Sequence, residues 1–310
     1  MKKSWKILSY AALLAVAALG LSTSTAGCVR RSNSGKLRIA AGLPPVAYLA
    51  ERVGGDAVEV KTMLMEGRSP HDYSPNASEK REAAFCRLFL TTGMSFEKKL
   101  ERSLQEGGTR IVDVSRGIER IPMEDSCGHD HDHDHDHDHD HDGFDPHVWL
   151  NAENACRMAE NIRDELCGAD PRHADLYRRN CEALLKELRE CEKRLKADMV
   201  PYRGRCFYVQ HPAFGYYAKM LGLRQVAMAD SGRDLTPDTL NKFTRRVKDD
   251  RCSIVFTQPQ FNPASARALK ERGLKVVEAD PLRCDLIKNF HDLGRELKAS
   301  FAESGNGGAK

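Results

Sequence analysis

The sequence lacks several features that define common functional classes. Beyond its first 28 residues it has no apolar run long enough to span a bilayer, which excludes a polytopic membrane protein. It has no block of Lys and Arg interleaved with aromatic residues, which make up only 7 % of the chain, so nucleic-acid binding is disfavoured. It also has no His-Glu-x-x-His motif, the helical signature of many zinc hydrolases.

What is present is typical of a folded chain of about two domains. The 310 residues are 41 % hydrophobic and 30 % charged, which is enough apolar material for packed cores. The formal net charge is +3, but the run His129–Asp142 alternates His and Asp and contributes seven acidic residues. The rest of the chain is therefore mildly basic, and its charge is spread rather than clustered.

Residues 1–28 have the parts of an export signal. A positively charged start precedes an apolar stretch over residues 7–20, which is too short for a comfortable membrane span. Cys28 follows Ala-Gly, as in a bacterial lipobox, where the thiol is diacylated after cleavage; the alternative is an ordinary cleaved signal peptide. We expect an extracytoplasmic protein, periplasmic or at the cell surface, that meets the membrane only through a lipid on Cys28. Residues 29–36 are polar and form the expected tether.

The chain has ten cysteines, which in an exported protein predicts disulfides. Removing Cys28 leaves an odd number, so at least one thiol stays outside any intramolecular pairing. Cys181 and Cys191 lie on one predicted helix, about 15 Å apart, and cannot pair with each other. The connectivity of the others stays open.

Strand and helix patterns alternate along most of the chain. The expected strands cover residues 37–41, 58–65, 87–91, 109–114, 205–210, 253–257 and 275–278. This alternation predicts an α/β fold with two lobes, residues 37–170 and 201–303, each built on a parallel sheet. Apolar residues at steps of three and four over 171–200 predict a helix of about 40 Å between the lobes. Residues 304–310 are rich in Gly and expected to be a disordered tail.

Four residues that can bind a metal are each next to a proline, and each follows a predicted strand or precedes a predicted helix. They are His71, His147, His211 and Asp280. In open α/β sheets ligands bind at the carboxyl ends of strands, so we expect these side chains to gather at that edge, two from each lobe. Three imidazoles and a carboxylate suit Zn²⁺ in a tetrahedral shell. Taken singly, each histidine is more often a hydrogen-bonding residue, and Asp280 could be a helix or turn cap.

The sequence resembles the metal-specific solute-binding proteins of bacterial ABC importers, the family that includes ZnuA-like zinc proteins. The motifs that carry the resemblance occur in the family's order and span nearly the whole chain after the signal: Gly67–Ser78 (GRSPHDYSPNAS), Gly93–Leu100 (GMSFEKKL), Asp145–Asn151 (DPHVWLN), His211–Ala218 (HPAFGYYA), Gln258–Ala264 (QPQFNPA) and Glu278–Leu282 (EADPL).

This resemblance implies a fold, a site and partners. The fold is two α/β lobes joined by a rigid helix, with the metal in the cleft between them. The implied ligands are His71, His147, His211 and Asp280. Whether Glu66 or a water competes with Asp280 for the fourth position stays open in the sequence. Manganese-type relatives commonly carry Glu where this chain has His211, which favours zinc. The implied partners are an ABC permease and its ATPase, and the protein is expected to be a monomer.

The alternating run falls where zinc members of the family often carry a His-rich loop. Its seven histidines are His129, His131, His133, His135, His137, His139 and His141. A flexible loop of neutral imidazoles would bind Zn²⁺ weakly and reversibly, because binding must order it. We expect it to gather zinc for the main site, with Cys127 as a further ligand or a disulfide partner. The alternative is solvated low-complexity sequence without a role.

Three functional alternatives follow from these residues. The first is a zinc-binding protein that feeds an importer and needs no catalysis. The second is a lipoprotein or adhesin that binds manganese or another divalent metal. The third is a zinc hydrolase, disfavoured because catalytic zinc keeps an open position for water, which Asp280 would close. His173 and His291 lie in charged helical contexts and are expected to be surface residues.

Overall fold

The computed structural model describes residues 35–65, 67–123, 143–228, 237–250, 252 and 254–305. The predicted export signal with Cys28, most of the tether, Glu66 and the His/Asp run lie outside the described residues. The last helix continues to Gly305, so the first two residues of the predicted tail are helical. Every helix in the described part of the chain is too short or too polar to cross a membrane.

The N-terminal lobe is built on a parallel four-stranded sheet in the order β2 (Val58–Thr62), β1 (Leu37–Ala41), β3 (Leu88–Thr91) and β4 (Arg110–Asp113). The inner strand β3 is buried along its whole length, whereas the edge strand β2 alternates between exposed residues and residues that are buried or partly buried. Ala41 pairs with Thr62 on one side and Leu90 on the other, so the strands end at a common edge. The elements of this lobe are β1 (Leu37–Ala41), α2 (Pro44–Gly54), β2 (Val58–Thr62), α3 (Ala77–Ala84), β3 (Leu88–Thr91), α4 (Ser95–Glu106) and β4 (Arg110–Asp113).

The C-terminal lobe repeats this arrangement with the parallel order β6-β5-β7-β8. Val209 pairs with Ala227 and Phe256, which again aligns the carboxyl ends of the strands. One strand, β6, was not predicted; it begins two residues after the left-handed helix cap at Gly222. The elements are β5 (Cys206–Val209), α7 (Gly215–Leu221), β6 (Arg224–Ala227), α8 (Pro237–Asp249), β7 (Ile254–Thr257), α9 (Pro263–Glu271), β8 (Lys275–Glu278) and α10 (Leu286–Gly305).

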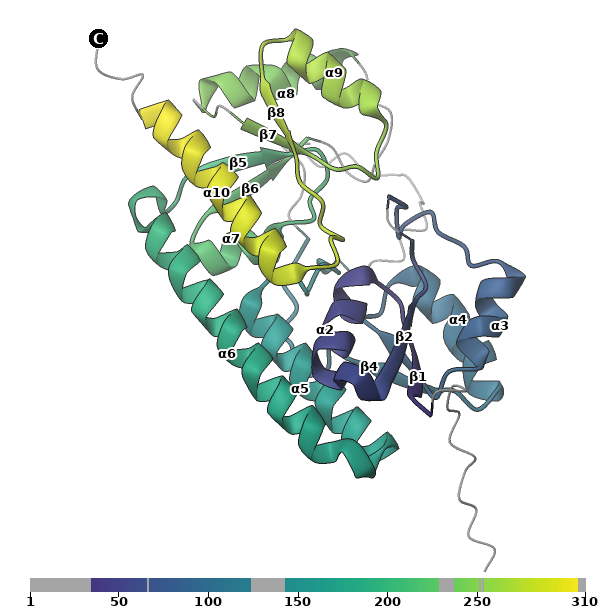
Figure 1. Ribbon diagram of the computed structural model, residues 1–310. Coiled ribbons are helices and arrows are strands. Elements are labelled where there is room, and N and C mark those ends of the chain that lie inside the picture. The colour runs from purple at the N-terminus through teal and green to yellow at the C-terminus, as the bar shows by residue number, and fades with distance from the viewer. Residues whose placement is uncertain are drawn as a thin grey trace, which may run out of the picture.

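The long helix α6 (Ala174–Met199) connects the lobes, and α5 (Ala152–Ala169) packs beside it. Helix α6 packs on α5 and α2 near one end and on α7 and α10 near the other, so it touches both lobes (Figure 1). Short 3₁₀ turns at Pro171–His173 and Val200–Tyr202 flank it. Its buried face is the predicted apolar stripe, running from Tyr177 to Met199. The predicted fold class, two parallel-sheet lobes joined by one long helix, is confirmed.

The expectation of disulfides is wrong for six of the described cysteines, which carry free thiols: Cys156, Cys167, Cys181, Cys191, Cys206 and Cys252. Cys156 on α5 and Cys181 and Cys191 on α6 are buried. In such surroundings cysteine acts as a small apolar residue. Burial raises the pKa of both Cys181 and Cys191 to about 11, which keeps the thiols protonated and unreactive. Cys28 and Cys127 lie outside the described residues.

The carboxyl of Glu97 organises the loop between β3 and α4. Its Oε2 accepts hydrogen bonds from Thr91 Oγ1 at 2.7 Å and from the three backbone N–H groups of residues 92–94, each at 2.9 Å. Its Oε1 occupies the space beside Gly42, where an added Cβ would lie 1.7 Å away. Burial outweighs these hydrogen bonds and raises the pKa of Glu97 to about 7.

The raised pKa of Glu97 makes folding stability depend on pH. Between its ordinary value of 4.5 and about 7, the native state holds a proton that the unfolded state has released. Stability is therefore lost as pH rises through this window. Relative to the Glu97→Gln variant, the free energy of unfolding of the wild type should fall by about 3 kcal/mol between pH 4.5 and pH 8. Urea unfolding at the two pH values measures this change. If wild type and Glu97→Gln differed in stability by the same amount at both pH values, this prediction would be contradicted. Glu106→Gln, at an exposed position on the same helix, is the control.

The contact between α6 and α10 depends on the absence of a side chain at Gly294. An added Cβ would lie 2.3 Å from Leu195 Cδ2 and 3.3 Å from the Tyr217 hydroxyl. Leu195 is buried and cannot swing aside freely. The close approach therefore holds the C-terminal helix on the helix that joins the lobes.

A Gly294→Val variant should be less stable by about 1–3 kcal/mol, because the larger side chain overpacks this contact. Thermal and urea unfolding measure the effect. Gly168→Val is the matched control, since Gly168 is an exposed helical residue with nothing within 4 Å of an added Cβ. Equal effects of the two substitutions would show that α10 does not depend on this contact.

Candidate metal centre

His71 lies in the loop that leaves the carboxyl end of β2. Ser69-Pro70-His71 forms a tight turn, in which Ser69 Oγ accepts a hydrogen bond of 3.2 Å from the His71 backbone N–H. Proline restricts its own φ and the residue before it, so the loop has few alternative conformations. His71 is the most exposed of the three histidines described below.

His147 precedes α5 and is only 2 % exposed. Asp145 Oδ1 lies 2.8 Å from His147 Nδ1 and also accepts a 2.9 Å hydrogen bond from the His147 backbone N–H. A carboxylate at Nδ1 favours the tautomer that leaves Nε2 as the electron-pair donor, the arrangement common in metal sites. The neighbouring Trp149 indole donates a 2.7 Å hydrogen bond to Pro281 O, which ties this segment to the C-terminal lobe.

His211 follows β5 and is 5 % exposed. Its backbone carbonyl accepts hydrogen bonds from Gln258 Nε2 at 3.2 Å and from the Ala213 N–H at 2.8 Å. Its ring packs against Phe261, with 5.4 Å between ring centroids. These contacts fix the backbone and the imidazole of His211 at the carboxyl edge of the C-terminal sheet.

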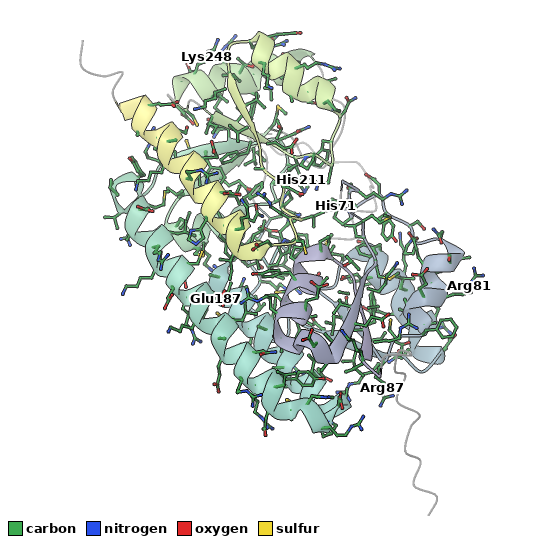
Figure 2. All side chains as sticks on the ribbon, viewed as in Figure 1. His71, Arg81, Arg87, Glu187, His211 and Lys248 are labelled. Atoms are coloured by element: carbon green, nitrogen blue, oxygen red, sulfur yellow. The ribbon has the colours of Figure 1, made fainter. Side chains whose placement is uncertain are left out.

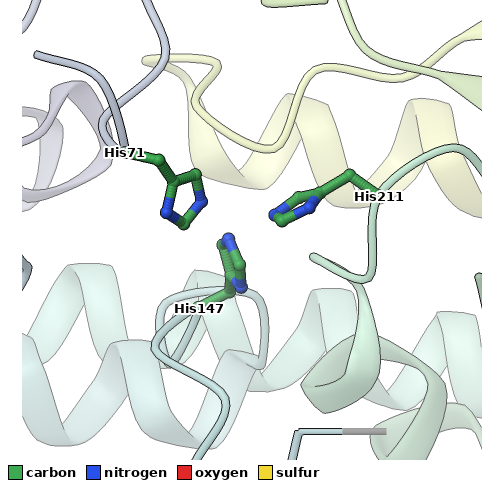
Figure 3. A group of neighbouring side chains, drawn as sticks. All are labelled: His71, His147 and His211. Atoms are coloured by element: carbon green, nitrogen blue, oxygen red, sulfur yellow. The ribbon is translucent and has the colours of Figure 1, made fainter. Parts of the chain in front are cut away.

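The three imidazoles converge, although they come from distant parts of the chain. Their ring centroids are 5.0 to 5.9 Å apart, and one nitrogen from each lies within 4.8 Å of the others (Figure 3). His71 and His211 approach each other where the two lobes meet (Figure 2). Three nitrogens bound to one Zn²⁺ would be about 3.4 Å apart, given Zn–N distances near 2.0–2.1 Å, so small side-chain shifts suffice.

Asp280, expected as a fourth ligand, is outside this group of three. Its Oδ1 accepts hydrogen bonds from Gln260 Nε2 at 2.7 Å and from the Leu282 N–H at 2.9 Å. His173 pairs with Asp170 at the start of α6 instead, and His291 lies on α10. The seven histidines of the alternating run, Glu66 and Cys127 lie outside the described residues.

A small cavity of about 10 Å³ adjoins the imidazoles, close to the minimum for one water molecule. It is lined by Ser69, Pro70, His71, His147, Gln258, Gln260, Phe261, Pro281 and Leu282. Asp145, Gln258 and Gln260 are site residues that were not predicted from the sequence. Their presence in the quoted DPHVWLN and QPQFNPA motifs was the available signal.

The chain is similar to several known metal-binding proteins. It is 28 % identical over 261 residues to the zinc-binding lipoprotein AdcA of Streptococcus pneumoniae, covering 82 % of this chain and 51 % of that protein. It is 26 % identical over 231 residues to the manganese-binding lipoprotein MntA of Halalkalibacterium halodurans, covering 73 % and 72 %. The chain thus spans about half the length of the AdcA proteins it matches.

The fold is also similar to solved structures. A crystal structure of ZnuA superposes with a TM-score of 0.76 at 26 % identity, covering 86 % of this chain and 99 % of that one. Residues 39–291 match the family model described as the zinc-uptake complex component A, periplasmic. This match spans most of the chain and confirms the resemblance seen in the sequence. The chain therefore belongs to the ZnuA family of metal-specific solute-binding proteins.

Proposed function

We propose that this protein captures Zn²⁺ outside the cytoplasm and delivers it to an ABC permease powered by a cytoplasmic ATPase. The observation that carries the proposal is the convergence of three histidine nitrogens at the junction of the lobes. Imidazole is a good ligand for zinc, and a structural zinc shell needs only one more donor. The zinc-binding lipoprotein AdcA and the family model for a zinc-uptake component support the same cargo.

The proposed ligands are His71, His147, His211 and Asp280. Both hydrogen bonds to the Asp280 side chain go to Oδ1, so Oδ2 is the oxygen that would turn toward the ion. The loop from Pro281 to Leu282 lines the cavity, so a small loop movement would bring the carboxylate to the imidazoles. Because α6 packs against both lobes, loading and release should involve loop rearrangement rather than wide lobe opening.

The donor set favours zinc over manganese. Mn²⁺ prefers oxygen ligands in an octahedral shell, whereas three imidazoles suit Zn²⁺. Manganese stays the alternative cargo, because one relative is named as a manganese-binding lipoprotein.

The remaining parts of the proposal concern residues outside those described. Cys28 would carry a lipid that tethers a monomeric protein at the periplasmic or cell-surface side of the membrane. The alternating run with His129 to His141 would bind further zinc ions weakly and pass them to the main site. The anionic Asp residues of that run would also attract a dication.

The first experiment removes one proposed ligand. In a protein lacking residues 128–142, so that only the main site remains, His211→Ala should weaken Zn²⁺ binding by more than about 100-fold, because loss of a ligand exceeds the effect of an outer-shell change. Competition with a chromophoric chelator measures the affinity. His291→Ala, a histidine on α10, is the matched control and should bind as the parent does. Equal losses in the two variants would refute the proposed site.

A second experiment tests the hydrogen bond behind His147. Asp145→Asn keeps the size of the side chain but weakens the acceptor at His147 Nδ1, so zinc affinity should fall about 10–100-fold. Asp170→Asn is the matched control, because Asp170 Oδ2 lies at the same 2.8 Å from His173 Nδ1 away from the cavity. Zinc affinity unchanged in Asp145→Asn would show that His147 needs no orienting partner.

A further inference from the structure

Two glutamines of the C-terminal lobe line the cavity beside the imidazoles. Gln258 and Gln260 follow β7, the strand next to β5 in the sheet. Gln258 is 4 % exposed, and the Oε1 atoms of both glutamines are buried. Buried amides in a cavity need a structural or functional reason, because desolvating them is costly unless they are paired.

Each glutamine donates a hydrogen bond to a residue proposed as a ligand. Gln258 Nε2 donates to His211 O at 3.2 Å, and Gln260 Nε2 donates to Asp280 Oδ1 at 2.7 Å. A carbonyl and a carboxylate can only accept, so both amides must face them with nitrogen. The two Oε1 atoms consequently stay buried, with no hydrogen-bond partner among the described residues.

We propose that Gln260 is a positioning residue for the metal, acting through Asp280; this rests on the function proposed above. The terminal torsion of an aspartate is broad, so one hydrogen bond leaves the carboxylate free to rotate. The Leu282 N–H and Gln260 Nε2 together hold Oδ1 from two sides. This fixes the plane of the carboxylate and leaves Oδ2 as the oxygen offered to the ion.

The arrangement also explains why an amide suits this position better than a carboxylate. A second acid 2.7 Å from Asp280 would repel it rather than hold it, whereas the amide donates a hydrogen bond and adds no charge. A hydrogen bond from the amide to an ionised oxygen is stronger than one between neutral groups. Gln260 thus orients the acidic ligand without competing for the ion as a second anion.

The test uses the full chain, with Zn²⁺ below one equivalent so that only the tightest site fills. Gln260→Met keeps a similar length and volume but cannot donate, and zinc affinity should fall about 10–100-fold. Asp280→Ala should weaken binding at least as much. In the Asp280→Ala background, adding Gln260→Met should change affinity less than about twofold, because its only route of action is gone. Additive losses would overturn the proposal.

A spectroscopic measurement separates positioning from a general effect on folding. Co²⁺ in place of zinc reports its coordination through its visible absorption, and Gln260→Met should shift this spectrum toward that of Asp280→Ala. Gln105→Met, an exposed glutamine on α4, is the control, and the melting temperature of each metal-free variant checks the fold. A wild-type cobalt spectrum in Gln260→Met would overturn the proposal. Unaltered zinc binding in Asp280→Ala would instead refute the proposed ligand set.

Discussion

The candidate metal centre depends on two parallel sheets held with the carboxyl edges of their strands facing one junction. Chain segments leave each sheet at this edge, so His71 after β2 and His211 after β5 meet, although 140 residues separate them. Helix α6 packs on α2 in one lobe and on α10 in the other. Without this helix, nothing in the order of the strands would fix the distance between the two edges.

Hydrogen bonds across the junction make this arrangement more specific. The Trp149 indole donates to the Pro281 carbonyl, and the Ile121 N–H donates to the Tyr216 hydroxyl at 3.2 Å. The carboxylate of Asp145 lies so close to Gly215 in α7 that an added Cβ there would be 2.6 Å from Oδ2. A residue that orients one imidazole is thus packed against the opposite lobe. The geometry of the site and the contact between the lobes are therefore set together.

The sequence was informative where one local pattern determines one structural feature. The alternation of strands and helices predicted both sheets, and the spacing of apolar residues predicted α6 almost to its ends. Prolines beside His71, His147 and His211 pointed to stiff loops at one edge of the sheets. The three imidazole rings indeed lie together. Features that depend on distant partners were missed. Strand β6 forms through its pairing with β5, and thiols such as Cys181 and Cys191 are buried rather than paired.

The place of Trp149 gives the protein a built-in optical probe. Its ring lies 5.4 Å from that of His147, and its N–H is bonded to the carbonyl that follows Asp280. The chain has two tryptophans, and the other, Trp5, lies in the predicted export signal. Tryptophan emission from an exported chain would then come from a single indole, which lies beside His147 and is bonded to the loop after Asp280. Binding or release of a metal at the candidate site would change the wavelength and intensity of this tryptophan emission, with no added label.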